Sequence, residues 1–432
     1  MSILPASSIG DESTGFYTQT IDQSLRFEDG DSAKLTRTPS SASNRKTWTL
    51  STWIKRGNLG TNDVIFAAYD SPHADFLRFN SSNELELALD NLYQVGTNAV
   101  FRDTTNWYHI VLALDVTEST STDRVKIYVN GTQQSLKIIY NAYPANTNYA
   151  FNSTNIHTIG ALSNFSAYEF DGYMAEFNFI DGTALDPTSF GETKNGVWIP
   201  KAISGLTYGT NGFRLTFADS SSLGDDTSGN GNDYTSSGLA STDVMLDTPT
   251  TNFATALGSI AESDDYQGYD APTSAEGNLK ITASGSAWNN GGSNFGMTSG
   301  KWYAECIVNS WQASNYVRIG LRAKPARTPD EYFVLGNGTG QLDGASRNGR
   351  LPSFSTGDVI QFALDLENQA FYLGKNNTWG NSATEAEIEA GTTTNAFASG
   401  SEVPINDGFA YFFYAQPHTS TTTITWNFGQ DS

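Results

Sequence analysis

Short stretches in which hydrophobic and polar residues alternate run through residues 21–200. Leu25 and Phe27 fall on one face of such a stretch, as in a strand with one buried side. Residues 107–115 (WYHIVLALD) and 123–133 (DRVKIYVNGTQ) are predicted to be a hairpin pair, because Asn-Gly supplies the positive φ that a tight turn needs. Strands at this spacing, polar on one side, predict an antiparallel β-sandwich.

A second strand-rich block occupies residues 276–432. Its best strand patterns are residues 301–308 (KWYAECIV) and the hairpin at 357–377, and they predict a second antiparallel sandwich. The intervening residues 201–275 are rich in Gly, Ser, Asp and Asn, which predicts a connecting segment, although residues 213–221 (FRLTFADSS) could pair with a sheet.

Few stretches of the chain favour helices, and its 40 glycines are typical of many short strands joined by turns. Residues 1–20 are polar and lack periodicity, so we expect an N-terminal arm. The predicted fold class is therefore all-β, with two antiparallel β-sandwiches joined by a Gly/Ser/Asp-rich segment.

The charge balance narrows the classes of partner. The chain has 24 Lys and Arg against 46 Asp and Glu, a formal net charge of −22, which repels phosphates. We therefore expect no nucleic-acid partner. No membrane insertion is expected either, because no stretch approaches the roughly 18 apolar residues of a membrane span. Residues 1–15 lack the basic and apolar regions of a signal peptide, so we expect synthesis in the cytoplasm.

Two family resemblances follow from particular motifs. The ordered set SLRFEDGDSAKLTR, WYHIVLALD, VKIYVNG and FDGYMAEFNFIDGTALDP, within residues 20–195, resembles the concanavalin/laminin-G-like jelly roll in its marine tailed-phage version. GKWYAEC, VRIGL and TGDVIQFALDLENQAFYLGKN resemble the SPRY sandwich. DVMLDTPTTNFAT (243–255) resembles the segment that precedes SPRY domains in marine phage structural proteins.

The resemblance implies a bacteriophage virion structural protein, exposed on the tail or head and made in the host cytoplasm. The expected role is a tail fibre or tail-associated adhesin for host attachment, which would make multivalent contacts with a surface glycan or protein. A capsid decoration or head-fibre protein is the alternative. The family also implies a homo-oligomer, a trimer, that contacts other virion proteins.

No catalytic site is predicted, because GxSxG, HExxH and P-loop patterns are absent from the sequence. His109 lies within a strand, where a structural role is expected. A glycan depolymerase is the remaining enzymatic hypothesis, since Glu84 and Glu86 would project from one face of a strand. Leu85, Leu87 and Leu89 occupy the opposite face and must face the core, so the glutamates would lie on an outer surface where nothing raises their pKa.

The residues DDTSGNGND offer calcium the oxygen ligands that it prefers, from Asp225, Asp226, Asn230 and Asp233. An EF-hand loop is excluded, because its twelfth position would be Ser237 rather than a glutamate. A flexible turn stabilised by Asx residues is the alternative interpretation. Calcium is therefore the one cofactor candidate.

Two other groups of residues are candidate binding elements. Trp288, Trp311 and Trp379 lie in polar loops, where they could stack on sugar rings; alternatively, each closes one edge of its sandwich. The position of Trp379 directly after a hairpin favours an inward orientation for its side chain.

Five cations gather around the strand TWTLSTWIKR: Arg37, Arg45, Lys46, Lys55 and Arg56. Three interpretations remain open: solvated strand ends, contacts with an acidic neighbouring subunit, or a polyanion site.

Overall fold

The computed structural model describes residues 16–70, 72–162, 168–257, 272–285, 288–289, 291–311, 317–324, 331–342, 345–403, 408–419 and 421–430. The chain divides into two compact units, and we call the one that ends at Asn252 the N-terminal unit and the one from Phe253 the C-terminal unit. Residues 1–15 of the predicted arm (residues 1–20) lie outside the described residues. Residues 16–20 belong to the N-terminal unit, in which Thr18 Oγ1 donates to Glu192 Oε1 at 2.5 Å.

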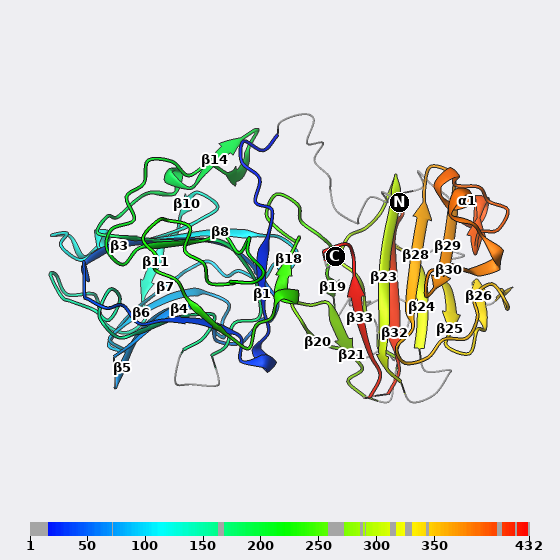
Figure 1. The fold of residues 1–432 in the computed structure, drawn as a ribbon, viewed down its shortest axis with the longest axis horizontal. Helices are drawn as coiled ribbons and strands as arrows, with labels where there is room; N and C mark the ends of the chain where they lie inside the picture. Colours follow the sequence, from blue (N-terminus) through cyan, green and yellow to red (C-terminus); the bar gives the residue numbers. More distant parts are fainter. Residues whose placement is uncertain are drawn as a thin grey trace. The chain divides into compact units, whose positions relative to one another are not determined.

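The N-terminal unit is a sandwich of two antiparallel sheets (Figure 1). Sheet 1 contains, in spatial order, β10 (Thr132–Gln133), β9 (Val125–Val129), β8 (Tyr108–Asp115), β3 (Thr47–Arg56), β13 (Gly172–Asp181), β1 (Ser24–Phe27) and β18 (Val244–Met245), with β16 (Phe213–Leu215) beside β13. Sheet 2 contains β11 (Leu136–Ile138), β7 (Tyr93–Thr97), β6 (Leu85–Leu89), β5 (His73–Phe79), β4 (Asp63–Asp70), β12 (Ile156–Ile159), β2 (Lys34–Arg37) and β17 (Thr235–Ser237).

Alternating apolar residues of the two sheets form one core. Trp48 and Leu50 of β3 are fully buried in it, with Phe66 of β4 and Phe177 of β13. The ring centroids of Phe66 and Phe177 are 5.7 Å apart, so aromatic contacts join the sheets directly. A separate hairpin, β14 (Gly191–Lys194) and β15 (Val197–Pro200), follows β13.

The structure differs from the predicted connecting segment at 201–275. Residues as far as Asn252 belong to the N-terminal unit, because β16 pairs with β13, β17 with β2, and β18 with β1. These strands have only two or three residues each, too few to show an alternating pattern. Their positions are set by strands distant in the sequence.

The C-terminal unit is a second antiparallel sandwich, and its described residues include a short α-helix, α1 (Glu385–Ala390). Sheet 3 contains β19 (Ala256–Leu257), β22 (Gly291–Ser293), β32 (Ala410–Pro417), β24 (Val317–Lys324), β25 (Glu331–Leu335), β26 (Gly340–Leu342) and β27 (Ala345–Ser346). Sheet 4 contains β20 (Thr273–Ala275), β21 (Lys280–Thr282), β33 (Thr423–Asn427), β23 (Lys301–Ser310), β28 (Val359–Asp365), β29 (Ala370–Lys375) and β30 (Thr378–Trp379), with β31 (Ala398–Ser399) beside β29.

The structure confirms the predicted fold class, all-β with two antiparallel sandwiches. The predicted hairpin at 357–377 is β28 and β29, whose register pairs Phe362 with Leu373. In the described part of the chain, no helix has the length and apolar character needed to span a membrane.

Candidate functional site

Lys55, at the end of β3, is buried in an ion pair. Its Nζ lies 2.7 Å from Asp247 Oδ2 and 2.8 Å from Asn252 Oδ1, and both charged side chains are fully buried. Trp107 Nε1 also donates to Asp247, at 3.0 Å. Burial lowers the pKa of Lys55, and the carboxylate of Asp247 partly offsets that effect. This cation therefore binds the chain that follows β18 to sheet 1.

Arg56 is buried in the same way, against a different carboxylate. Its guanidinium donates to Asp63 Oδ2 at 2.7 Å, Asn83 Oδ1 at 3.0 Å and the carbonyl of Phe101 at 2.7 Å. The guanidinium carbon lies 4.2 Å from the centroid of the Phe79 ring. The prediction of solvated strand ends is therefore wrong for Lys55 and Arg56, because the carboxylates of Asp247 and Asp63 cover them.

The other three cations of the stretch lie apart from this ion-paired end. Arg37 donates to the side chains of Asn211 and Asn232, and Arg45 Nε donates to the carbonyl of Tyr149. Lys46 is half-buried and has no ion pair among the described residues. The five cations thus form no single surface, and the predicted subunit contact stays a prediction for Arg37, Arg45 and Lys46 only.

The three candidate tryptophans have separate packing environments. The half-buried ring of Trp288 lies 4.2 Å from the guanidinium of Arg318, and the half-buried ring of Trp311 stacks on Phe354 with centroids 5.9 Å apart. Trp379 is only 9% exposed and packs into an apolar cluster with Tyr303. Trp379 therefore points inward and has no open face for a sugar ring, so its assignment as a stacking residue is wrong.

Asp226, in the predicted calcium loop, uses both carboxylate oxygens to fix a turn. Oδ1 accepts the backbone N–H groups of Arg214 and Ser228, each at 2.9 Å. Oδ2 accepts the Ser228 hydroxyl at 2.9 Å and the backbone N–H of Asn232 at 2.8 Å. This geometry is the Asx-stabilised turn that was the alternative interpretation.

The other predicted ligands of that loop have hydrogen bonds of their own or face solvent. Asp233 Oδ1 accepts the backbone N–H of Asp226 at 2.9 Å, while Asn230 Nδ2 donates to two backbone carbonyls at 2.7 and 2.8 Å. Asp225 is exposed. The four predicted ligands therefore have individual hydrogen-bonding or solvent environments, and calcium at this loop stays a prediction.

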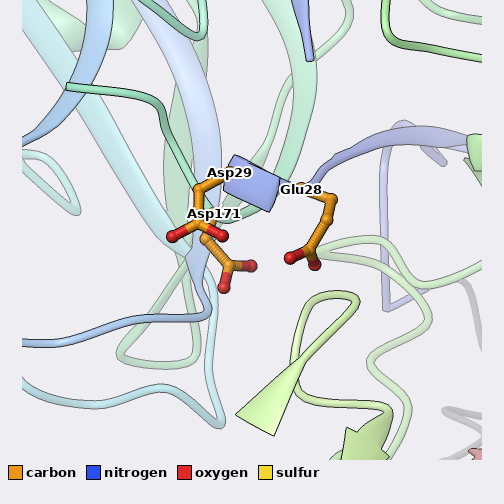
Figure 2. Close-up of side chains that lie close together, drawn as sticks. All are labelled: Glu28, Asp29 and Asp171. Carbon is orange, nitrogen blue, oxygen red and sulfur yellow. The ribbon is translucent and has the colours of Figure 1, made fainter. Parts of the chain in front are cut away.

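Three acidic side chains gather elsewhere, at Glu28, Asp29 and Asp171 (Figure 2). One carboxylate oxygen from each lies within 4.8 Å of the others, and Asp171 is only 1% exposed. Asp171 immediately precedes β13, and its backbone carbonyl accepts the N–H of Gly57 at 2.9 Å. A Cβ at residue 57 would lie 2.3 Å from Asp171 Oδ1, so glycine there leaves room for the carboxylate.

This carboxylate cluster offers the hard oxygen donors that calcium takes in proteins. Sequence reasoning missed it, because Asp171 is far in the chain from the adjacent pair Glu28 and Asp29. The only local signal was the acidic turn EDGD at residues 28–31.

The glutamates considered for hydrolysis are held by hydrogen bonds on sheet 2. Glu84 Oε1 lies 2.6 Å from Lys137 Nζ, and Glu86 Oε1 lies 2.8 Å from the guanidinium of Arg78. Asn80 Nδ2 donates to both glutamates, at 3.2 and 3.1 Å. Burial acts to raise the pKa of Glu84, but the hydrogen bonds from Lys137 and Asn80 outweigh it, so the pKa is lowered. A general acid requires the opposite shift.

His109 has the structural role that the sequence predicts. Trp198 Nε1 donates to its Nδ1 at 2.9 Å, so Nε2 carries the proton and donates to Ser51 Oγ, also at 2.9 Å. The ring stacks on Trp53 with centroids 4.6 Å apart, and burial lowers the pKa of His109 to about 3. In this tautomer the imidazole cannot take a proton from Ser51, so the pair is not a nucleophile and its base.

Comparisons with known proteins find similarity over part of the chain. Residues 28–188 match the laminin-G-type family model described as the concanavalin A-like lectin/glucanases superfamily. No curated protein matches the sequence significantly.

Three of the similar solved structures are the following. A heptameric SAP-like pentraxin from Limulus polyphemus is 13% identical, with 52% of this chain and 98% of that chain covered and a TM-score of 0.35. The SPRY domain of human HERC1 is 18% identical, with coverages of 34% and 87% and a TM-score of 0.27. A putative carbohydrate-binding protein from Bacteroides ovatus is 15% identical, with coverages of 51% and 58% and a TM-score of 0.33. Within the N-terminal unit, residues 28–188 are thus similar to a superfamily whose name covers both lectins and glucanases.

Proposed function

We propose that this chain is a non-enzymatic adhesin that binds glycans. One contrast in the N-terminal unit carries the proposal: residues 28–188 match a superfamily of lectins and glucanases, whereas Glu84 and Glu86 are held in ion pairs. A glycosidase needs one carboxyl group with a raised pKa, and the pKa of Glu84 is lowered. Of the two classes in the superfamily's name, these observations favour the lectins over the glucanases.

The finer part of the proposal places the adhesin on the exterior of a tailed-phage virion, as a tail fibre or tail-associated protein. Its support is the resemblance at residues 20–195 and 243–255 to phage structural proteins. Copies of the chain would form a homo-oligomer, a trimer by that resemblance, and would contact other virion proteins. Several weak glycan contacts in one particle then multiply into firm attachment to the host surface.

Immunogold electron microscopy tests the location. Purified particles of a phage that encodes the chain would be labelled with antibody against residues 277–432. Gold on tail appendages is the expected result, and gold spread over the head would favour the capsid decoration protein instead. Particles that carry no gold, from a preparation in which the antibody detects the free chain, would refute the virion proposal.

Product analysis tests the absence of catalysis. The full chain would be incubated at high concentration with host polysaccharide, and reducing ends would be counted. No release above the buffer control is expected. Release that disappears in the Glu84→Gln variant would identify a depolymerase and overturn the non-enzymatic proposal.

A further inference from the structure

An open pocket with a volume of about 480 Å³ lies in the N-terminal unit where an edge of sheet 1 meets an edge of sheet 2. The chain leaves β10 in sheet 1, crosses through Gln134 and Ser135, and enters β11 in sheet 2. The N–H of Gln134 donates to the carbonyl of Ile127 in sheet 1 at 2.8 Å, and the carbonyl of Ser135 accepts the N–H of Asn98, which follows β7, at 2.9 Å. Because the crossing is hydrogen-bonded on both sides, the pocket is preformed, and its volume is in the range of small-ligand sites.

We propose that this pocket binds an uncharged oligosaccharide. The inference rests on the proposed glycan-binding function and assigns it a location and a class of sugar. Three properties of the pocket lead to it: the chemistry of the walls, the charge balance, and an exposed apolar ridge beside the opening.

The walls combine an apolar floor with polar groups that are free to bind a ligand. Val95, Val125 and Tyr143 are buried beneath the pocket. The exposed side chains of Gln133 and Ser135 line it, and in the described part of the chain the structure records no hydrogen bond from either side chain. Amides and hydroxyls both donate and accept hydrogen bonds, as the hydroxyl groups of a sugar do.

Two more exposed hydroxyls enlarge this polar wall. Ser121 and Thr122 belong to the 3₁₀ turn η3 (Ser121–Asp123), which precedes β9, and both line the pocket. Their side-chain oxygens also have no hydrogen bond recorded within the described residues. Together with Gln133 and Ser135, they give the pocket four exposed, uncharged side chains that can form hydrogen bonds with a ligand above an apolar floor.

The charge balance favours a neutral ligand. Lys137 is the one charged residue among those described as lining the pocket, and its Nζ lies 2.6 Å from Glu84 Oε1. An acidic sugar would have to compete with that carboxylate for the ammonium group, against the field of a chain with net charge −22. An uncharged sugar neither competes with the carboxylate of Glu84 nor is repelled by the negative charge of the chain.

An apolar ridge borders the pocket. Eight large hydrophobic residues are exposed in the described chain, and three of them, Ile138, Ile139 and Tyr140, are consecutive. Tyr140 is 61% exposed, and a fourth, Leu92, is joined to the ridge by a 2.9 Å hydrogen bond from Asn141 Nδ2 to its carbonyl. Exposed apolar groups gathered in one place mark a binding surface, and the ring of Tyr140 offers a flat face for the C–H side of a sugar.

The backbone holds this ridge in place. The N–H groups of Ile139 and Tyr140 both donate to the carbonyl of Gln94, at 2.8 and 3.3 Å. Ile139 also covers Gly96, where an added Cβ would lie 2.8 Å from its Cδ1. The ridge is therefore a fixed continuation of the sheet edge, so a chain of sugars that fills the pocket could extend over it.

The test uses the full chain and an array of neutral and acidic oligosaccharides, followed by calorimetric titration of the best neutral sugar. Ala142→Trp fills the pocket from an exposed position on its wall. The double variant Gln133→Ala/Ser135→Ala removes two hydrogen-bonding groups, and Tyr140→Ala removes the aromatic face. The matched control is Ser236→Ala, which removes an exposed hydroxyl from β17 at the opposite edge of sheet 2.

We expect Ala142→Trp to abolish measurable binding, and the double variant and Tyr140→Ala each to weaken it about tenfold. The control should stay within about twofold of the wild type. Thermal unfolding of each variant confirms that it is folded, and the exposed positions of all five substitutions make this the expected result.

Each other outcome has a definite meaning. If a neutral sugar binds and the pocket variants bind it as the wild type does, the pocket is overturned while the adhesin function stands. If only acidic sugars bind, the neutral class is overturned. If no sugar binds at millimolar concentration, the glycan-binding function fails, and the inference fails with it. If Tyr140→Ala or Ala142→Trp changes the oligomeric state instead, the surface is a subunit interface and the sugar site is overturned.

Discussion

Replacing Arg56 with methionine should strongly destabilise the N-terminal unit. Methionine keeps much of the apolar stem but removes the guanidinium, which leaves the buried carboxylate of Asp63 without its cation. The carbonyl of Phe101 loses a donor as well. Burial already raises the pKa of Asp63, which shows that the charged carboxylate is costly at this position even when it is paired.

The expected loss is about 3–5 kcal/mol, the usual result of removing one partner from a buried ion pair. For a unit of this size, about 1 kcal/mol moves the midpoint of thermal unfolding by about 2–4 °C, so Arg56→Met should lower it by roughly 6–20 °C. Adding Asp63→Leu should recover part of the loss, since it removes the uncompensated charge. With the single variant Asp63→Leu measured as well, the double-mutant cycle gives the coupling between the two charges.

Differential scanning calorimetry is the suitable assay, because the two units can give separate transitions. The transition that moves in Arg56→Met belongs to the N-terminal unit, and the other should not move. Lys46→Met is the control from the same cationic stretch, and its effect should stay within about 0.5 kcal/mol. A loss below about 1 kcal/mol for Arg56→Met would refute the argument, because it would mean that water reaches Asp63 once the guanidinium is gone.

Two further predictions concern buried and clustered carboxylates. Burial raises the pKa of Asp75 to about 7, although its carboxylate accepts three backbone N–H groups. Between about pH 4 and 7, the folded state therefore binds a proton at Asp75 that the unfolded state has released. The unfolding free energy of the wild type should therefore fall as the pH rises through this window, by up to about 4 kcal/mol relative to Asp75→Asn. Urea titrations from pH 4 to 8 measure this difference. Parallel curves of unfolding free energy against pH for the wild type and Asp75→Asn would contradict the prediction. In the carboxylate cluster, Asp29→Asn should raise the unfolding midpoint by about 1–2 °C in chelator, because it removes a like charge near Asp171. A lower midpoint for Asp29→Asn than for the wild type in millimolar calcium would instead reveal a bound cation.

The fold could be predicted wherever the signal in the sequence is local. The turn after β9 has Asn130 at φ 48° and Gly131 at φ 75°, as the Asn-Gly pair predicts, and the register between β8 and β9 pairs Ile110 with Val129. Residues 201–252 could not be placed in this way. Their strands are too short to have a period, and only the partner strands determine where they bind.

The candidate sites could be predicted from the sequence even less well, because their residues come from distant parts of the chain. The sequence places Lys55 at the polar end of a strand, and nothing near it in the chain indicates that Asp247 will cover it. Asp171 likewise reaches Glu28 and Asp29 only through the folded sheet. Trp379 was the easier case, because a residue that directly follows a hairpin is often turned back onto it, and the structure buries it there.

The position of β1 between β13 and β18 has a consequence for how the protein is made. The register pairs Ser24 with Met245, so one edge of the first strand has no partner until about 220 further residues have left the ribosome. At about 5–20 residues per second, that interval is on the order of 10–40 seconds. Throughout it the nascent chain carries an open strand edge, on which other chains can assemble. The speed of translation between β13 and β18 should therefore influence how much of the protein reaches its native state.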